Sequence, residues 1–283
     1  MKKNTLFLLL VLLCLMTGTV SHAKATEFKG LFEDSYVGLD EPVQHGSYYF
    51  KYQEDGIYMA DAENGSYKKT SLTYDSLTDG MKAYYVQGRN LYAYTLSTGK
   101  AKKLKKLPAK KEAYFSVSMV YNNRIFLTLS SYDEFRYLTY QYNMKTKKLK
   151  LIKKDCNLVR NYGTYAVSFD QLRTDVSPTP VTLYRITSSS LKKIKKLTSD
   201  GMSCRFIRGK LYYIEYDSYM MQKMTIYRCK PNGSGKKKLA ELSARGENGV
   251  IYMQEMYADK CKVFMGDGTY IYTYATKQLE NAN

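Results

Sequence analysis

The side chains to consider first are those that could act as a general base, a nucleophile or a metal ligand. The chain has two histidines, His22 and His45, and histidine is the usual base and metal ligand near neutral pH. His45 could serve a serine triad only with a Gly-x-Ser-x-Gly elbow, and Gly233-Ser234-Gly235 has a different spacing. A loop or packing role is therefore favoured for His45, and two histidines are too few for a His-rich zinc site.

Carboxylates are the next candidates, because a pair of them can carry out glycoside hydrolysis. Pairs occur at Glu54-Asp55, at Asp133-Glu134, and at Glu215 with Asp217. Adjacent acids in turns are usually solvated, so these pairs leave hydrolysis open without predicting it. The sequence has neither a P-loop nor an oxygen-rich calcium loop. It therefore predicts no cofactor, no metal site and no catalytic residue.

Four cysteines follow the first 25 residues, at Cys156, Cys204, Cys229 and Cys261. Their spacings of 48, 25 and 32 residues match neither a CxxC metal clip nor a dense disulfide framework. Two disulfides are possible in an oxidising compartment, but scattered cysteines more often behave as small buried hydrophobic residues. We favour free thiols.

The first 25 residues have the three parts of a cleavable secretion signal. Lys2 and Lys3 form a positive start, 6–16 is an apolar run, and either Ser21-His22-Ala23 or Ala23-Lys24-Ala25 is a small-x-small cleavage site. The apolar run is about half of the ~20 residues that span a membrane. Cys14 follows Leu13 and not the Gly or Ala of a lipobox. We expect residues 1–25 to be a signal peptide and 26–283 a single secreted domain.

Lysine is abundant and clustered. The net charge is +18, and it becomes +15 without residues 1–25, which hold three lysines and no acidic residue. The clusters recur at similar places along the chain: Lys102, Lys103, Lys105, Lys106; Lys147, Lys148, Lys150; Lys192, Lys193, Lys195, Lys196; and 236–238.

The elements that would position these side chains form a repeat. An apolar-aromatic pair, a short polar turn and a lysine-rich stretch occur six times, beginning at Ile57, Leu91, Tyr140, Leu183, Ile226 and Ile271. The steps of 34, 49, 43, 43 and 45 residues centre on the ~40–45 residue period of a four-stranded propeller blade. Short aromatic and β-branched runs between turn residues have the composition of strands. They are 47–50, 83–86, 124–127, 165–167 and 211–214.

We therefore predict an all-β fold, a single β-propeller of six four-stranded blades, with five or seven blades as alternatives because two steps are irregular. Val117–Tyr121 and Cys204–Ile207 would supply the first strands of two blades. The last repeat ends soon after Leu279, so Glu27–Phe32 is expected to return and supply its outer strand, which would close the ring.

One repeat carries a resemblance to a known family. The stretch 226–239, IYRCKPNGSGKKKL, follows 209–214, GKLYYI. It resembles the blade repeat of TolB-like propellers, and in particular an uncharacterised propeller family of secreted clostridial proteins. Asn232 stands where that repeat usually has Asp. The resemblance implies the propeller fold, and the family has no shared catalytic residues to carry over.

In a propeller, the lysine clusters would lie on the outermost strands and form a rim. One interpretation is edge protection, because lysines on an exposed edge strand discourage pairing with other chains. The other is electrostatic contact with an anionic envelope polymer or lipid surface. Tyrosine, with 30 residues, is expected mainly to fill the space between blades.

Ligand-binding groups are expected in three long loops between the second and third strands of consecutive blades, at 131–136, 171–180 and 216–224. Long loops on a rigid scaffold are where binding groups collect. Their candidate residues are Asp133, Arg136, Arg173, Asp175, Tyr216, Asp217 and Tyr219.

These features favour a secreted, non-enzymatic binding or scaffold module at the outside of a bacterial cell. Its ligand would be a protein or an anionic or glycan component of the envelope; neither nucleic acid nor a transmembrane segment is predicted. The alternative is a hydrolase or lyase that uses carboxylates or tyrosines at one propeller face. A carboxylate site near the central channel would favour the enzyme, and channel walls of apolar and hydroxyl groups would favour the binder.

Overall fold

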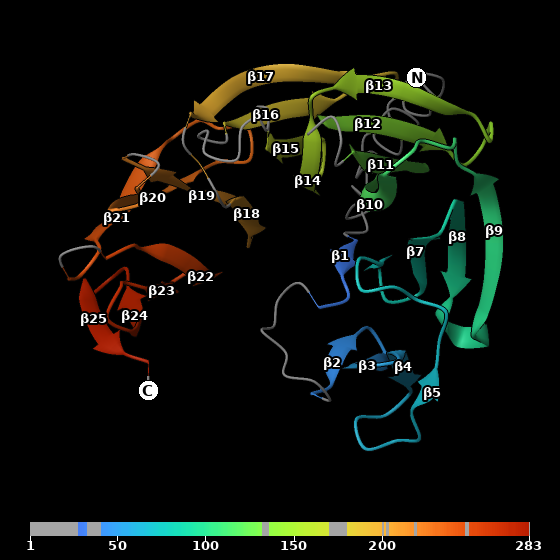
Figure 1. The fold of residues 1–283 in the computed structure, drawn as a ribbon, viewed down its shortest axis with the longest axis horizontal. Helices are drawn as coiled ribbons and strands as arrows, with labels where there is room; N and C mark the ends of the chain where they lie inside the picture. The colour runs from blue at the N-terminus through green and yellow to red at the C-terminus, as the bar shows by residue number, and fades with distance from the viewer. Residues whose placement is uncertain are drawn as a thin grey trace, which may run out of the picture.

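The computed structural model describes residues 28–32, 41–131, 136–169, 180–199, 201, 204–217, 220–246 and 249–282. The predicted signal segment, residues 1–25, lies outside these ranges. In the described ranges the chain forms six antiparallel sheets (Figure 1), which we number as blades 1 to 6 in chain order.

Blades 1 to 3 come from the first half of the chain. Blade 1 contains β2 (Val43–His45), β3 (Tyr48–Gln53), β4 (Gly56–Ala60) and β5 (Lys68–Lys69). Blade 2 contains β1 (Lys29–Gly30), β6 (Leu77–Thr78), β7 (Lys82–Gln87), β8 (Asn90–Thr95) and β9 (Lys100–Lys106), with a 3-10 turn, η1 (Leu96–Thr98), before β9. Blade 3 contains β10 (Ala113–Tyr121), β11 (Arg124–Ser131), β12 (Arg136–Asn143) and β13 (Leu149–Lys154).

Blades 4 to 6 follow the same order of strands. Blade 4 contains β14 (Asn157–Tyr162), β15 (Tyr165–Phe169), β16 (Val181–Ile186) and β17 (Leu191–Thr198). Blade 5 contains β18 (Cys204–Ile207), β19 (Lys210–Tyr216), β20 (Lys223–Cys229) and β21 (Lys237–Ser243). Blade 6 contains β22 (Tyr252–Met256), β23 (Lys260–Phe264), β24 (Thr269–Thr273) and β25 (Gln278–Asn281).

Tight hairpins connect the inner strands of the blades. Asn122 and Asn123 turn the chain between β10 and β11 with φ of 47° and 57°, and Arg208 and Gly209 do so between β18 and β19 with φ of 47° and 70°. Two successive residues with positive φ are typical of the type I′ turn, whose twist matches that of the flanking strands. These turns fix the register of the hairpins at the inside of the arc.

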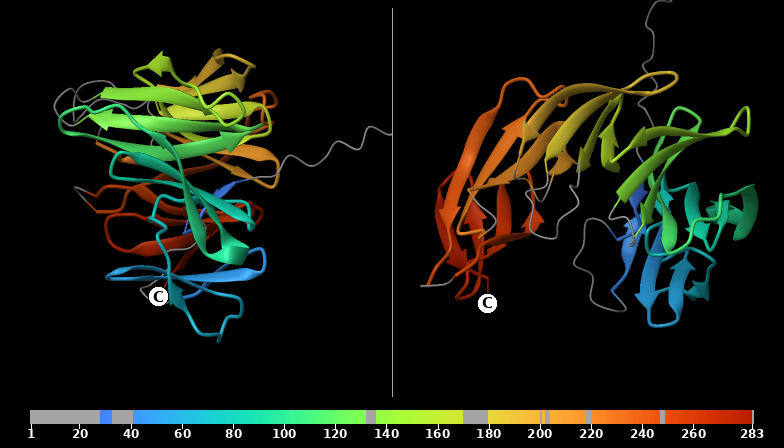
Figure 2. Two further views of the ribbon diagram at one scale, coloured as in Figure 1. Left: turned by 90° about the vertical axis from the view of Figure 1, so that its right-hand side faces the viewer. Right: turned by 45° about the horizontal axis from the view of Figure 1, so that its top comes forward.

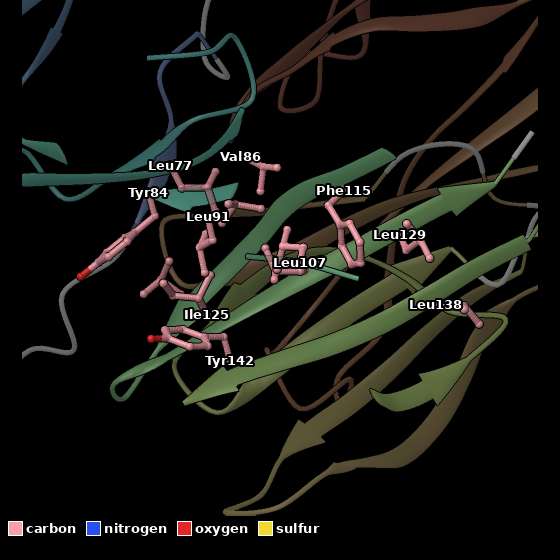
Figure 3. Close-up of a cluster of buried hydrophobic side chains, with 13 residues drawn as sticks. Leu77, Tyr84, Val86, Leu91, Leu107, Phe115, Ile125, Leu129, Leu138 and Tyr142 are labelled. Carbon is pink, nitrogen blue, oxygen red and sulfur yellow. The ribbon is translucent and has the colours of Figure 1, made fainter. Parts of the chain in front are cut away.

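The hydrophobic core lies between the blades. The described buried residues form five clusters, and each joins two consecutive blades from 1–2 to 5–6. Figure 3 shows the cluster between blades 2 and 3, where Leu91 and Leu107 of blade 2 meet Phe115 and Ile125 of blade 3. Because every interior blade is covered on both faces, central strands such as β11 are buried along most of their length.

Blades 6 and 1 share none of these clusters, and the blades form an arc whose first and last members stand apart (Figures 1 and 2). The outward face of blade 1 carries Lys51, Tyr58 and Lys69 on paired strands. On the outward face of blade 6, Lys262 lies 3.9 Å from Glu255, and Tyr252 stacks on Phe264. Polar outer faces on the end units are what a stack of repeats needs in order to stay soluble.

The prediction that Glu27–Phe32 completes the last blade is wrong. The strand β1 pairs instead with β6 at the inner edge of blade 2, and β25 completes blade 6 from its own repeat. Leu31 and Phe32, next to β1, are 0% and 5% exposed in the cluster between blades 1 and 2. Burial of these two side chains therefore holds β1 in blade 2; Glu27 lies outside the described residues.

Candidate functional site

The three predicted loops do connect the second and third strands of blades 3, 4 and 5. Four of their candidate residues lie outside the described residues: Asp133, Arg173, Asp175 and Tyr219. Arg136, the first residue of β12, forms an ion pair with Asp155 at 3.3 Å. Because Asp155 lies between β13 and β14, this pair connects the loop end of blade 3 to the start of blade 4.

Tyr216 and Asp217 end β19 in blade 5 and have different surroundings. Tyr216 is buried in the cluster between blades 5 and 6, and burial raises its pKa to about 12. Asp217 accepts a hydrogen bond from the Lys223 amide at 3.1 Å, and its own amide donates to the Lys223 carbonyl. The structure thus places Tyr216 in the core and gives Asp217 a part in closing the loop.

The carboxylate pairs of the sequence hold local structure together. The Asp55 carboxylate accepts hydrogen bonds from Lys69 Nζ at 2.7 Å and from the Tyr58 hydroxyl at 2.9 Å. These hydrogen bonds lower the pKa of Asp55. Glu215 lies 3.7 Å from Lys236, and the pair 133–134 lies outside the described residues.

His45 has the packing role predicted for it. Its Nε2 lies 2.7 Å from the Leu31 carbonyl oxygen, and its ring meets the edge of Phe50 at 5.8 Å. These contacts connect β2 to the chain after β1.

The four cysteines are buried free thiols, as the spacing predicted. Burial raises the pKa of Cys204 and of Cys261 to about 12. The thiolate is the nucleophilic form of cysteine, and at neutral pH these two residues hold the thiol.

Most lysines of the predicted clusters lie on the outermost strands of the blades; Lys147, Lys148 and Lys236 lie in the turns just before them. The strands β9, β13 and β17 contain five, three and four lysines and no acidic residue. They follow one another along the outside of the arc (Figure 1). We call the lysines of these three strands the lysine belt.

No lysine of the belt forms an ion pair with a carboxylate in the part of the chain that the structure describes. Two of them contact other groups: Lys153 Nζ lies 5.3 Å from the centre of the Tyr184 ring, and Lys195 Nζ donates to the Gly233 carbonyl. Most of the others are exposed. The belt is therefore a surface of uncompensated positive charge.

The outer strands of the other blades differ from the belt. In blade 5, Glu241 on β21 forms ion pairs with Lys223 at 2.6 Å and with Lys238. In blade 6, β25 contains Glu280 and no lysine. In blade 1, Lys69 on β5 is paired with Asp55. The charge is thus concentrated on blades 2 to 4 and does not form an even rim.

The first strands of the blades lie at the inside of the arc (Figure 1), and two cavities are lined by residues of these strands. The first has a volume of about 540 Å³ and extends from β14 and β18 to the turn after β22. The second has about 530 Å³ and lies among β6, β10, β14 and β18. Arg160 and Arg205 line both cavities, whereas Asp259 lines only the first and Asp75 only the second.

No protein-family profile matches the sequence, and no curated protein is similar to it. Solved structures with a similar fold do exist. Oligogalacturonate lyase from Vibrio parahaemolyticus is 11% identical, with 92% of this chain and 79% of that chain covered and a TM-score of 0.59. An uncharacterized protein from Listeria monocytogenes is 14% identical, with 92% and 84% covered and a TM-score of 0.52. Described residues and neighbours agree on the architecture. This chain folds as a six-bladed β-propeller.

TolB from Acinetobacter baumannii is also similar, at 15% identity, with 82% of this chain and 59% of that chain covered and a TM-score of 0.43. The propeller fold that the TolB-like resemblance implied is confirmed by the six blades, whereas nothing connects the chain to a clostridial family. At such identities the likeness concerns the fold alone, because one fold supports many activities. Among the described residues of the propeller, no helix is long and apolar enough to cross a membrane.

Because its long loops pointed to other residues, the sequence did not predict a role for Arg160 or Arg205. Each lies in the first strand of a blade. The first strands lie at the inside of the arc, so the order of strands within a repeat could have singled these two residues out.

Proposed function

We propose that this protein is an exported, non-enzymatic propeller that binds an anionic polymer of the cell envelope through its lysine belt. The observation that carries the proposal is the placement of the belt on three consecutive outer strands without carboxylate partners in the described chain. Export is expected from the signal pattern of residues 1–25, and it would bring the belt into contact with envelope polymers.

Repulsion among the lysines of the belt favours the binding of an anionic partner. Side chains two positions apart on a strand lie on the same face, about 7 Å apart. That separation is shorter than the Debye length of about 10 Å at 0.1 M salt. Neighbours such as Lys100 and Lys102, which pair with Thr95 and Ala93 on one face, therefore repel one another in the free protein. An anionic polymer running along the belt would relieve this repulsion at many lysines at once.

Edge protection is the competing explanation for the lysines, and it predicts a different distribution. Every blade has an outer edge strand to protect, so protection alone would place lysines on all of them. In the structure, β25 has none and β21 has Glu241 among its lysines. Their concentration on blades 2 to 4 favours a surface that meets a partner.

The alternative function, a hydrolase or a lyase acting at one propeller face, has less support. A glycosidase needs two carboxyl groups on either side of one bond. In the described part of the chain, the acidic residues Asp75 and Asp259 line different cavities. The cavity walls carry arginines, so they match neither the carboxylate site expected of an enzyme nor the apolar and hydroxyl walls expected of a simple binder.

Retention on isolated envelopes tests the proposal. In the belt variant, the five lysines of β9 are changed to glutamine. In the control, five exposed lysines of blades 5 and 6 are changed in the same way: Lys210, Lys230, Lys237, Lys260 and Lys277. Both variants lose the same formal charge. We expect the belt variant to be released from the envelope at lower salt than the control. Equal release of the two variants, or retention that salt does not affect, would contradict the proposal.

A further inference from the structure

The first inner cavity has features that the lysine belt does not explain. Its volume of about 540 Å³ lies within the range of ~300–1,000 Å³ typical of small-molecule sites. Its walls come from four blades: β1 of blade 2, β14 of blade 4, β18 of blade 5 and the turn after β22 of blade 6. A site at the junction of several blades is held by the cores on either side.

Two arginines mark the boundary between the two inner cavities. Arg160 on β14 and Arg205 on β18 line both, and each is half-buried. Guanidinium groups bind carboxylates with two parallel hydrogen bonds. This end of the cavity is therefore suited to an anionic group.

An aromatic surface lies beside the arginines. Tyr162, at the end of β14, stacks on Phe206 of β18 with ring centroids 5.9 Å apart and an angle of 28°. The Tyr162 ring is 39% exposed, so part of it is open to a ligand. A Cβ atom at Gly209 would lie 3.1 Å from the Tyr162 hydroxyl, which shows how closely the turn after β18 holds this ring.

The rest of the cavity wall has two further cations, Lys29 and Arg208, and two groups that suit hydroxyls. Asn161 and Asp259 line the same cavity as Tyr162. An amide can donate or accept, and a carboxylate accepts from hydroxyls. An end that binds anions, an aromatic surface and groups that bind hydroxyls together fit an acidic sugar.

We propose that this cavity binds an acidic saccharide, with a carboxylate on Arg160 and Arg205 and a pyranose ring against Tyr162. The observations behind this site are independent of the belt, which lies on the outermost strands. A uronic acid has both required parts, a ring with hydroxyls and one carboxylate. The site thus differs from the belt in needing a particular shape as well as charge.

Calorimetric titration of the full protein with three probes tests the ligand class. Trigalacturonic acid has rings and carboxylates, its methyl ester has the rings without the charge, and tricarballylate has the carboxylates without a ring. We expect saturable binding of trigalacturonic acid and at least tenfold weaker binding of the other two. No binding of trigalacturonic acid, or equal binding of either comparison compound, would overturn the proposal.

Variants then locate the site. Arg160→Gln, Arg205→Gln and Tyr162→Ala should each weaken trigalacturonic acid binding by about tenfold or more, in line with the loss of a charged hydrogen bond or a ring contact. Arg185→Gln is the matched control, because Arg185 is exposed on β16 and contacts Tyr165. The belt variant should bind this probe as the wild type does. If the folded Tyr162→Ala and Arg205→Gln variants both keep wild-type affinity, the site is wrong.

Discussion

At the scale of single residues, Arg124 is the buried charge on which two blades depend. It begins β11 in blade 3 and is 6% exposed. Its Nη1 donates to the Thr187 carbonyl of blade 4 and to Gln141 Oε1 at 3.3 Å. Its guanidinium carbon lies 5.6 Å from the centre of the Phe126 ring. Burial lowers the pKa of Arg124, so these contacts must compensate for lost hydration.

Arg124→Met should lower the free energy of unfolding by about 2–4 kcal/mol, because it leaves buried acceptors without their donor. Arg185→Met removes an exposed arginine that also contacts a ring, and it should cost less than about 1 kcal/mol. Urea unfolding of both variants measures the difference. An equal loss of unfolding free energy in the two variants would mean that the contact of Arg124 between blades 3 and 4 adds little to stability.

Glu241 gives stability a dependence on pH. Hydrogen bonds from Lys223 and Lys238 lower its pKa from 4.5 to about 2. A carboxyl group whose pKa is lower in the folded protein stabilises it above the unfolded pKa, and this contribution is lost as the pH falls through the folded pKa. The contribution of Glu241 is therefore complete above about pH 4.5 and disappears toward pH 2.

Glu241→Gln should be less stable than the wild type at pH 6, and the two should converge toward pH 2. Thermal unfolding across this range measures the difference. Because Glu241 is exposed, about 1 M salt should shrink it. A difference that is constant with pH would show that ionisation of Glu241 is not its cause.

The sequence predicted residue roles well where a role follows from residue type. Free cysteines and a packing role for His45 are examples. It did not predict Arg124 or Arg160, because an arginine in a strand has the same pattern whether it faces solvent, a neighbouring blade or the central cavities. Only the pairing of blades distinguishes these environments.

At the scale of elements, the strands of the blades could be predicted and the partner of β1 could not. Runs such as 83–86 and 211–214 have a strong strand composition and lie within β7 and β19. The strand β1 has two residues and one of them is glycine, so it has no pattern that selects a partner. The burial of Leu31 and Phe32 determines its position.

Leu31→Ala tests this placement of the first strand. Leu31 is fully buried, and its amide donates to the Ser76 carbonyl at 3.1 Å. The variant should lose about 2–5 kcal/mol of stability through the cavity that it creates. Lys29→Ala, an exposed position on β1, should lose less than about 0.5 kcal/mol. A mild effect of Leu31→Ala, measured by urea unfolding, would show that this segment is not part of the core.

At the scale of the whole molecule, the six repeats were predictable and the open arc was not. The period and the composition of each repeat predicted six blades, with five or seven left open by the two irregular steps, and the structure has six. Closure of the ring depends on whether the outward faces of blades 1 and 6 fit each other. Because the repeats are irregular, their sequences do not show whether these two faces fit. Both outward faces have charged side chains, such as Lys51 of blade 1 and Lys262 of blade 6, whereas the residues that form the interior clusters are apolar and aromatic.

Two neighbours on β23 test the open arc. Val263 is 0% exposed and faces blade 5, whereas Phe264 lies on the outward face and stacks on Tyr252 at 5.0 Å. Val263→Ala should cost about 2 kcal/mol. Phe264→Ala, although it removes more atoms, should cost less than about 1.5 kcal/mol. A cost of about 3–5 kcal/mol for Phe264→Ala would show that blade 6 is covered and the ring is closed.

The asymmetry of charge is the other property of the whole molecule, and it carries the proposed function. Equilibrium binding to a defined poly(glycerol phosphate) chain, between about 0.05 and 0.5 M salt, tests it most directly. We predict that affinity falls steeply with salt, because binding releases counterions from the polymer. The belt variant should bind more weakly, and with a shallower salt dependence, than the control variant with the same formal charge. Salt-independent binding, or the same loss in both variants, would contradict the account.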